Sequence, residues 1–66
     1  MSMPQPELGK HYNLTHKKTS NNPFRGYVQV VDAGFLGGLK IFRTSQNGNN
    51  WYFWDDYHHE YIGDLA

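Results

Sequence analysis

The chain concentrates its aromatic residues near one end. Six of its eleven aromatic residues lie between Trp51 and Tyr61, and four of them are consecutive. Neighbouring side chains on a β-strand point to opposite faces of a sheet, so one buried face cannot hold all of these rings. Each buried ring removes about 150–250 Å² from water, which suits the core of a small protein. We therefore expect one set of rings to fill a core and a second set to meet another layer, a partner or a ligand.

The length and the lack of cysteine limit how such a chain is stabilised. It has 66 residues and no cysteine, which favours a single domain. A domain of this size buries only about 60% of the surface that its unfolded chain exposes. Without disulfides, the remaining sources of stability are an aromatic core, a metal held by histidines, or a partner subunit.

The same features bear on the compartment. A chain without cysteine is typical of a reducing environment. The first ten residues contain two prolines and no apolar run, unlike a signal peptide, and no segment reaches the roughly 20 apolar residues that span a bilayer. We expect a cytoplasmic protein that binds no membrane.

Alternating patterns and turn residues predict an all-β fold. Period-2 alternation and β-branched or aromatic residues predict strands at 11–17, 27–33, 39–44, 51–55 and 61–65. Asn47-Gly48 predicts a hairpin turn, because both residues tolerate positive φ. The pattern at 55–60 also allows a short helical or 3₁₀ turn. We expect residues 1–9 to be a flexible arm and 10–66 a single β domain, built as a small five-stranded antiparallel barrel or a strongly curved sheet.

The strand patterns also assign residues to the core. We expect the buried face to hold Leu14, Val28, Val30, Leu39, Ile41, Trp51 and Ile62. Trp51 and Trp54 are three apart, so they face opposite sides of an extended strand. We expect Trp51 to be buried and Trp54 to be partly exposed.

The last third of the chain resembles SH3-like barrels in plan. A tryptophan opens a late strand, a long loop precedes residue 27, and Tyr61-Ile62-Gly63-Asp64-Leu65 closes the chain. SH3 domains place a Gly-Tyr-Ile-Pro segment there, and this chain lacks both the preceding glycine and the proline. The acidic first loop of SH3 domains is also replaced here by Lys17 and Lys18. The resemblance therefore implies SH3-like architecture and carries no polyproline-binding function.

Charge is unevenly distributed although the net charge is zero. Residues 10–43 contain six basic residues and one acidic residue, whereas residues 44–66 contain four acidic residues and no basic one. The asymmetry predicts either a basic and an acidic binding face or two halves that neutralise each other across the sheet.

Three local clusters have weak chemical signals. His58 and His59 stand among Asp55, Asp56 and Glu60, but adjacent residues on an extended chain point apart and do not converge on one metal. The glycine-rich segment 34–38 opens no helix, so it lacks the geometry of a phosphate loop. No serine or threonine stands in a recognisable nucleophile turn. We expect no enzyme, no catalytic residue, no small-molecule substrate, no metal and no cofactor.

The preferred function is a protein-interaction module. Tryptophan, tyrosine and arginine dominate the energetics of protein interfaces. We expect a larger protein or a second copy of this chain to bind at Trp54, Tyr52, Tyr57, Arg25 and Arg43. A small accessory protein of the kind that phages encode, which blocks or bridges a larger protein, fits this composition. The arm could instead fold back over these rings through Pro4 and Pro6.

The alternative function is binding of single-stranded nucleic acid. Small barrels bind such strands with cations on phosphates and aromatic rings stacked on bases. The candidates for this are Lys17, Lys18, Arg25 and Arg43 with Phe24, Tyr27 and Trp54. Zero net charge counts against this function, because nucleic-acid binders usually carry a basic excess.

Overall fold

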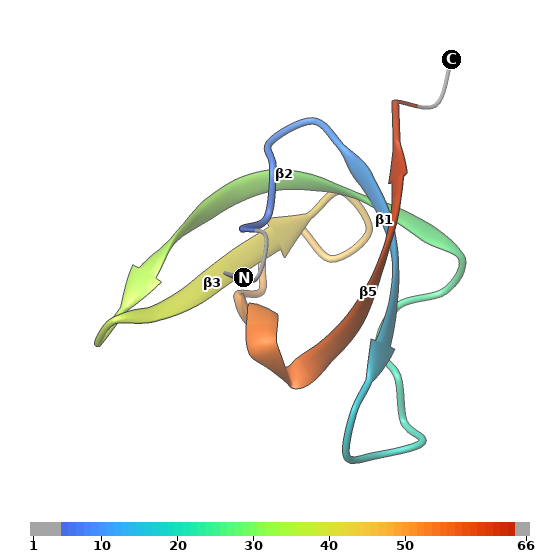
Figure 1. Ribbon diagram of the computed structural model, residues 1–66, viewed down its shortest axis with the longest axis horizontal. Coiled ribbons are helices and arrows are strands. Elements are labelled where there is room, and N and C mark those ends of the chain that lie inside the picture. The colour runs from blue at the N-terminus through green and yellow to red at the C-terminus, as the bar shows by residue number, and fades with distance from the viewer. Residues whose placement is uncertain (1–4, 65–66) are drawn as a thin grey trace.

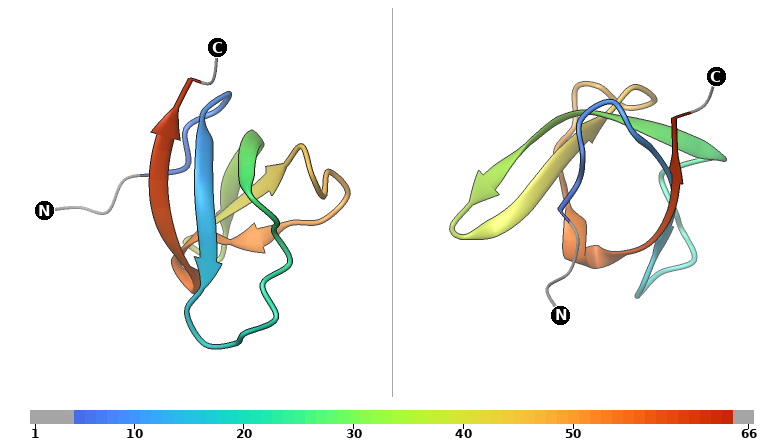
Figure 2. Two further views of the ribbon diagram at one scale, coloured as in Figure 1. Left: turned by 90° about the vertical axis from the view of Figure 1, so that its right-hand side faces the viewer. Right: turned by 45° about the horizontal axis from the view of Figure 1, so that its top comes forward.

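The computed structural model describes residues 5–64, which form one antiparallel sheet (Figure 1). The strands are β1 (His11–His16), β2 (Tyr27–Leu36), β3 (Leu39–Thr44), β4 (Tyr52–Phe53) and β5 (Tyr57–Gly63), and a single 3₁₀ turn, η1 (Trp54–Asp56), joins β4 to β5. The order across the sheet is β4-β3-β2-β1-β5, so β4 and β5 are its two edges and the sheet is not closed. The prediction of an all-β fold is confirmed. The two views of Figure 2 show that the sheet curves around its inner face.

Strand boundaries match the pattern best where alternation is strongest. β3 has the predicted bounds, and β1 ends one residue early. β2 runs three residues past its predicted end at Ala33, through Gly34, because it pairs with β3 as far as Leu36↔Leu39. The strand bounds near the end of the chain were predicted less well: β4 is only two residues long, and β5 begins at Tyr57, four residues before the predicted start at Tyr61.

The two hairpins, β2–β3 and β3–β4, have different turn geometries. Leu36 pairs with Leu39 across Gly37 and Gly38, whose φ angles are 57° and 80°. Positive φ at both central residues is the geometry of the tightest hairpins. Asn47-Gly48 does lie between β3 and β4, but neither residue has positive φ. The strong hairpin signal therefore marked the right place with the wrong turn geometry.

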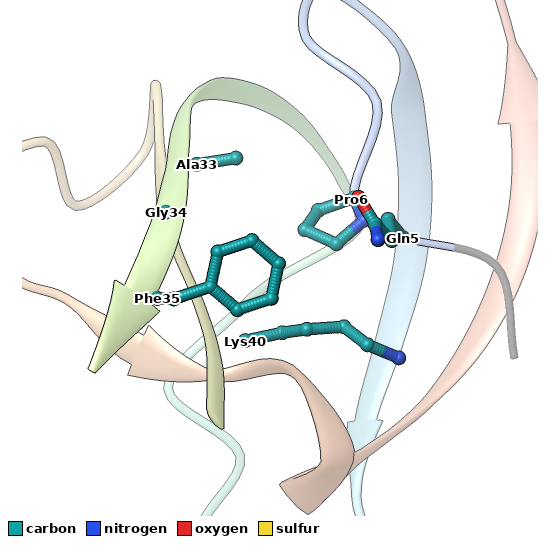
Figure 3. A pocket seen from close by; sticks show the side chains of 6 residues that line it. All are labelled: Gln5, Pro6, Ala33, Gly34, Phe35 and Lys40. Atoms are coloured by element: carbon teal, nitrogen blue, oxygen red, sulfur yellow. The ribbon is translucent and has the colours of Figure 1, made fainter. Parts of the chain in front are cut away.

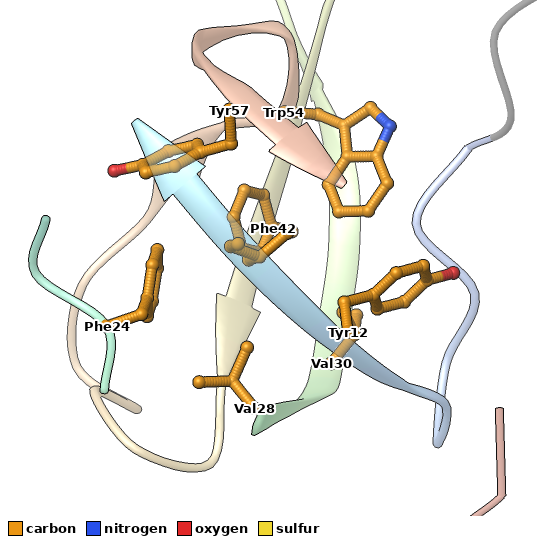
Figure 4. Close-up of a cluster of buried hydrophobic side chains, with 8 residues drawn as sticks. Tyr12, Phe24, Val28, Val30, Phe42, Trp54 and Tyr57 are labelled. Atoms are coloured by element: carbon orange, nitrogen blue, oxygen red, sulfur yellow. The ribbon is translucent and has the colours of Figure 1, made fainter. Parts of the chain in front are cut away.

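The core is an aromatic cluster on the inner face of the curved sheet (Figure 4). Its buried members are Tyr12, Leu14, Phe24, Val28, Val30, Phe42, Trp54 and Tyr57. Edge-to-face contacts connect the rings: Phe42 lies 5.2 Å from Trp54 and Tyr12 lies 5.0 Å from Trp54, measured between centroids. Such contacts add about 0.5–1.5 kcal/mol per pair beyond the area they bury.

The core prediction was right for β1 and β2 and wrong for β3 and for Trp51, the residue before β4. Leu14, Val28 and Val30 are fully buried, as expected, but Leu39 is 55% exposed and Trp51 is 47% exposed. β3 turns Phe42 and Thr44 inward and leaves Leu39 and Ile41 on its outer face. Ile62 is only partly buried.

One choice of face explains both tryptophan errors. Tyr52 pairs with Phe42 and Phe53 with Ile41, so the facing of β3 sets the facing of β4. With Phe42 inside, Trp51 points outward, and η1 then carries Trp54 into the core, where it is fully buried. The two tryptophans do face opposite sides, but the predicted sides are reversed.

The segment before β1 packs against the sheet. Pro6 is buried, the Gly9 amide donates to the Val30 carbonyl at 2.8 Å, and the Glu7 amide donates to the Tyr12 hydroxyl at 3.1 Å. Figure 3 shows Gln5 and Pro6 facing Phe35 and Lys40 of the β2–β3 hairpin. Residues 5–9 thus partly cover the inner face, whereas Pro4 lies outside the described residues. Flexibility of the arm stays a prediction.

Candidate functional site

The aromatic residues predicted to anchor a partner lie mostly inside the protein. Trp54 and Tyr57 are buried, and Tyr52 is partly buried against Phe24 and Phe42. Burial raises the pKa of Tyr57 to about 12. The expectation that Trp54 is partly exposed was wrong, and with it the reason for choosing these rings as surface anchors. Their contacts are those of a core.

The two predicted arginines have different surroundings. Arg43 donates to the Asp32 carboxylate and to the Gly48 carbonyl, both at 2.8 Å, and its guanidinium lies 5.2 Å from the centre of the Trp51 ring. It therefore connects β2, β3 and the loop before β4. The Arg25 side chain is exposed, and its backbone is held by the Gln46 side chain at 2.9 and 2.6 Å.

The residues of the nucleic-acid alternative are not all available. Lys17, Lys18 and Tyr27 are exposed. Phe24 is 4% exposed and packs 4.8 Å from the Tyr52 ring, edge to face. A ring in that position has no open face on which a base could stack.

Exposed apolar side chains gather instead on the outer face of β2, β3 and β4. Ile41 pairs with Phe53 on one side and with Gly34 on the other, and Leu36 pairs with Leu39 at the hairpin. Directly paired residues of an antiparallel sheet point to the same face. We call this set the outer apolar face: Leu36, Leu39, Ile41, Trp51 and Phe53.

The outer apolar face has little side-chain cover within the chain. Leu36 is 60% exposed and Phe53 is 40% exposed. Gly34 places no side chain beside Ile41 on the β2 side, where an added Cβ would lie 4.0 Å from the Ile41 side chain. The charged residues Asp32 and Arg43 lie at one end of the face and form an ion pair with each other. The centre of the face is therefore apolar.

The alternation in β3 did indicate which residues share the outer apolar face, but we assigned that face to the core. Leu39, Ile41 and Arg43 share one face by alternation, and two aliphatic residues suggested burial. The alternative set of Phe42 and Thr44 buries a larger ring and needs no buried arginine. The presence of Arg43 on the aliphatic face was the cue to its exposure.

The acidic and histidine-rich segment separates into two environments. His58 is exposed, whereas His59 turns inward and stacks on Trp54 with ring centres 3.8 Å apart and planes 4° from parallel. Within residues 5–64, no three histidine, aspartate or glutamate side chains form a group that could hold a metal ion. No helix in the same range has the length and apolarity to cross a membrane.

Comparison with protein-family models, with curated proteins and with solved structures finds no match to this chain.

Proposed function

We propose that this protein is a non-enzymatic interaction module that binds another protein through the outer apolar face. The observation that carries the proposal is the exposure of Leu36, Leu39, Trp51 and Phe53, each 40–60% exposed on one side of a sheet whose other side has its own aromatic core. Contiguous exposed apolar surface of a few hundred Å² is typical of interaction sites.

Charge on this face favours a protein over a nucleic acid. Phosphate binding needs basic side chains that are free to release their counterions. Arg43, the basic residue of this face, is already engaged by Asp32 and Gly48. A partner whose contact surface is also apolar, and which uses Trp51 or Phe53 as an aromatic anchor, matches this arrangement best.

The first occupant to test is a second copy of the chain. β4 is an edge strand of two residues, and the distal part of the β2–β3 hairpin is paired on one side only. Open edges beside an apolar face allow self-complementary pairing around a two-fold axis.

The proposal extends to architecture. We propose that the curved sheet has the architecture of an SH3-like small barrel. The pairing of β1 with β5 and the 3₁₀ turn between the last two strands support this proposal. An experimental structure that lacks the β1–β5 pairing would contradict it. A cytoplasmic location stays a prediction.

The experiment compares Leu39→Ser/Trp51→Ser with wild type by sedimentation over a concentration series, and then by pull-down from the source cells with and without nuclease. Tyr27→Ser is the matched control, because Tyr27 is equally exposed but lies on a different part of the sheet. We expect nuclease-resistant association, with itself or with a captured protein, that the double variant loses and the control keeps. Association that survives in the folded double variant, or that nuclease abolishes, would overturn the proposal.

A further inference from the structure

A second surface feature lies on the opposite side of the sheet from the outer apolar face. It is a pocket of about 320 Å³ lined by Glu7, Tyr12, His59 and Tyr61. Tyr12 and Tyr61 are paired across β1 and β5, and Glu7 comes from the segment that precedes β1. The pocket therefore lies where the inner face of the open sheet is only partly covered by that segment. Its volume is at the low end of the range for small-ligand sites.

Three aromatic rings line this pocket, of which Tyr12 is almost fully buried and His59 and Tyr61 are more exposed. The Tyr61 ring lies 5.3 Å from the Tyr12 ring at an angle of 61°. His59 lies flat on the buried Trp54, is itself partly buried, and lines the pocket. The rings thus stand at steep angles to one another around a common space.

The walls are held in place before any ligand binds. The His59 Nε2–H donates to the Trp54 carbonyl at 2.6 Å, which fixes the orientation of the imidazole. The Tyr12 hydroxyl accepts from the Glu7 amide, and Figure 4 shows this hydroxyl pointing toward the segment before β1. Tyr61 is 55% exposed, yet its ring lies against Gly63, where a Cβ would be 3.6 Å away.

The charge beside the rings is the negative charge of Glu7, which has no ion-pair partner within residues 5–64. The only hydrogen bond that the Glu7 carboxylate makes within the same residues is from the Tyr61 hydroxyl, at 3.5 Å. Lys10, the nearby cation, is bound at 3.0 Å to Asp64. A carboxylate beside aromatic faces attracts a cation and repels an anion.

We propose that the pocket formed by Glu7, Tyr12, His59 and Tyr61 binds an alkylammonium group. The faces of aromatic rings attract ammonium ions, most strongly when methyl groups reduce the ion's hydration, and aromatic cages that recognise methylated amines use this attraction. A metal ion fits poorly, since one carboxylate and one imidazole are too few ligands. The site is separate from the outer apolar face and does not depend on that face binding a protein.

Two sources of the alkylammonium group are separated by the choice of probe. Choline represents a free quaternary amine, and a short peptide with a trimethylated or unmodified lysine represents a protein side chain. The neutral alcohol 3,3-dimethylbutanol has the shape of choline without its charge. Each probe is titrated into the full chain and followed by two-dimensional NMR of backbone amides.

We expect choline or the trimethyl-lysine peptide to shift the amides of Tyr12, His59 and Tyr61 in a saturable way, and dimethylbutanol to bind at least about fivefold more weakly. Tyr61→Ala should reduce affinity about fivefold or more, whereas Tyr61→Phe keeps the ring and should keep binding. Glu7→Gln should weaken binding of the cation without changing that of the alcohol. Tyr27→Ala should have no effect, because Tyr27 alternates with the buried Val28 and is exposed on the other face of the sheet.

The variants remain informative because Glu7 and Tyr61 are exposed, and their amide spectra report directly whether the protein is folded. Equal binding of choline and dimethylbutanol would reduce the pocket to an apolar hollow and overturn the proposal. So would the absence of saturable shifts with all of the cations, or binding by Tyr61→Ala equal to that of wild type.

Discussion

At the scale of single residues, the two tryptophans have opposite roles. Trp54 contacts Tyr12, Phe42 and His59 and has no exposed surface. Trp51 lies outside the core, beneath the Arg43 guanidinium. A substitution should therefore affect stability at one position and surface properties at the other.

We expect Trp54→Ala to lower the free energy of unfolding by about 3–5 kcal/mol, because it removes a large ring from the centre of the core. In a domain of this size such a loss approaches the whole stability. Trp51→Ala should cost less than about 1 kcal/mol. Chemical denaturation followed by tyrosine fluorescence measures both. A Trp51→Ala protein less stable than Trp54→Ala would reverse the assignment of faces.

His59 should make stability depend on pH. Burial, chiefly, lowers its pKa below the ordinary 6.5, and Lys17 and His58 lower it further, while the Trp54 carbonyl and Asp55 oppose this. As pH falls below about 6.5, the unfolded chain takes up a proton that folded His59 resists, so stability is lost on the acid side. Denaturation at about pH 7.5 and about pH 5 should show this loss. This loss of stability at acid pH should be smaller in His59→Phe and unchanged in His58→Gln, because His58 is exposed. The same dependence of stability on pH in wild type and both variants would contradict the prediction.

At the scale of elements, the β2–β3 hairpin is the least supported part of the sheet. Its distal half projects away from the other strands (Figure 1), and its tip carries the exposed Phe35, Leu36 and Leu39. A two-stranded ribbon is marginally stable by itself, so its turn geometry matters. Gly37 and Gly38 provide that turn.

We expect Gly38→Ala to destabilise the protein by about 1–2 kcal/mol, since Gly38 has a φ of 80° that a Cβ disfavours. Gly48→Ala is the matched control. Gly48 has no positive φ, and an added Cβ would make an ordinary 3.6 Å contact with the Thr44 carbonyl. Thermal unfolding should separate the two variants. Equal stability of both would mean that the hairpin tip tolerates a different turn.

At the scale of the whole molecule, the open sheet needs cover from outside its strands. η1 brings Trp54 into the core between β4 and β5, and the segment before β1 adds the buried Pro6. Hydrogen bonds from Gly9 to Val30 and from the Gln29 side chain to Gly9 attach that segment to β2. It is therefore part of the fold from Gln5 onward.

We expect deletion of residues 1–9 to lower stability by at least about 2 kcal/mol, because the net loss of each hydrogen bond is about 1 kcal/mol and Pro6 also loses its burial. Pro6→Ala in the full chain should show a smaller loss of the same sign. Urea denaturation measures both. A truncated protein as stable as the full chain would show that these contacts add nothing to the fold.

The sequence by itself determined the all-β class, three of the five strands and the core residues of β1 and β2. These are consequences of local alternation, where one face is clearly more apolar than the other. Tertiary structure decided the facing of β3, because Leu39 and Ile41 compete with Phe42, and only packing against Phe24 and Trp54 favours the ring. It also decided the positions of η1, Trp54 and the two surface features, since these depend on strands and segments that meet from distant parts of the chain. Alternation specifies which residues share a face, and only contact with the rest of the core determines which face is buried.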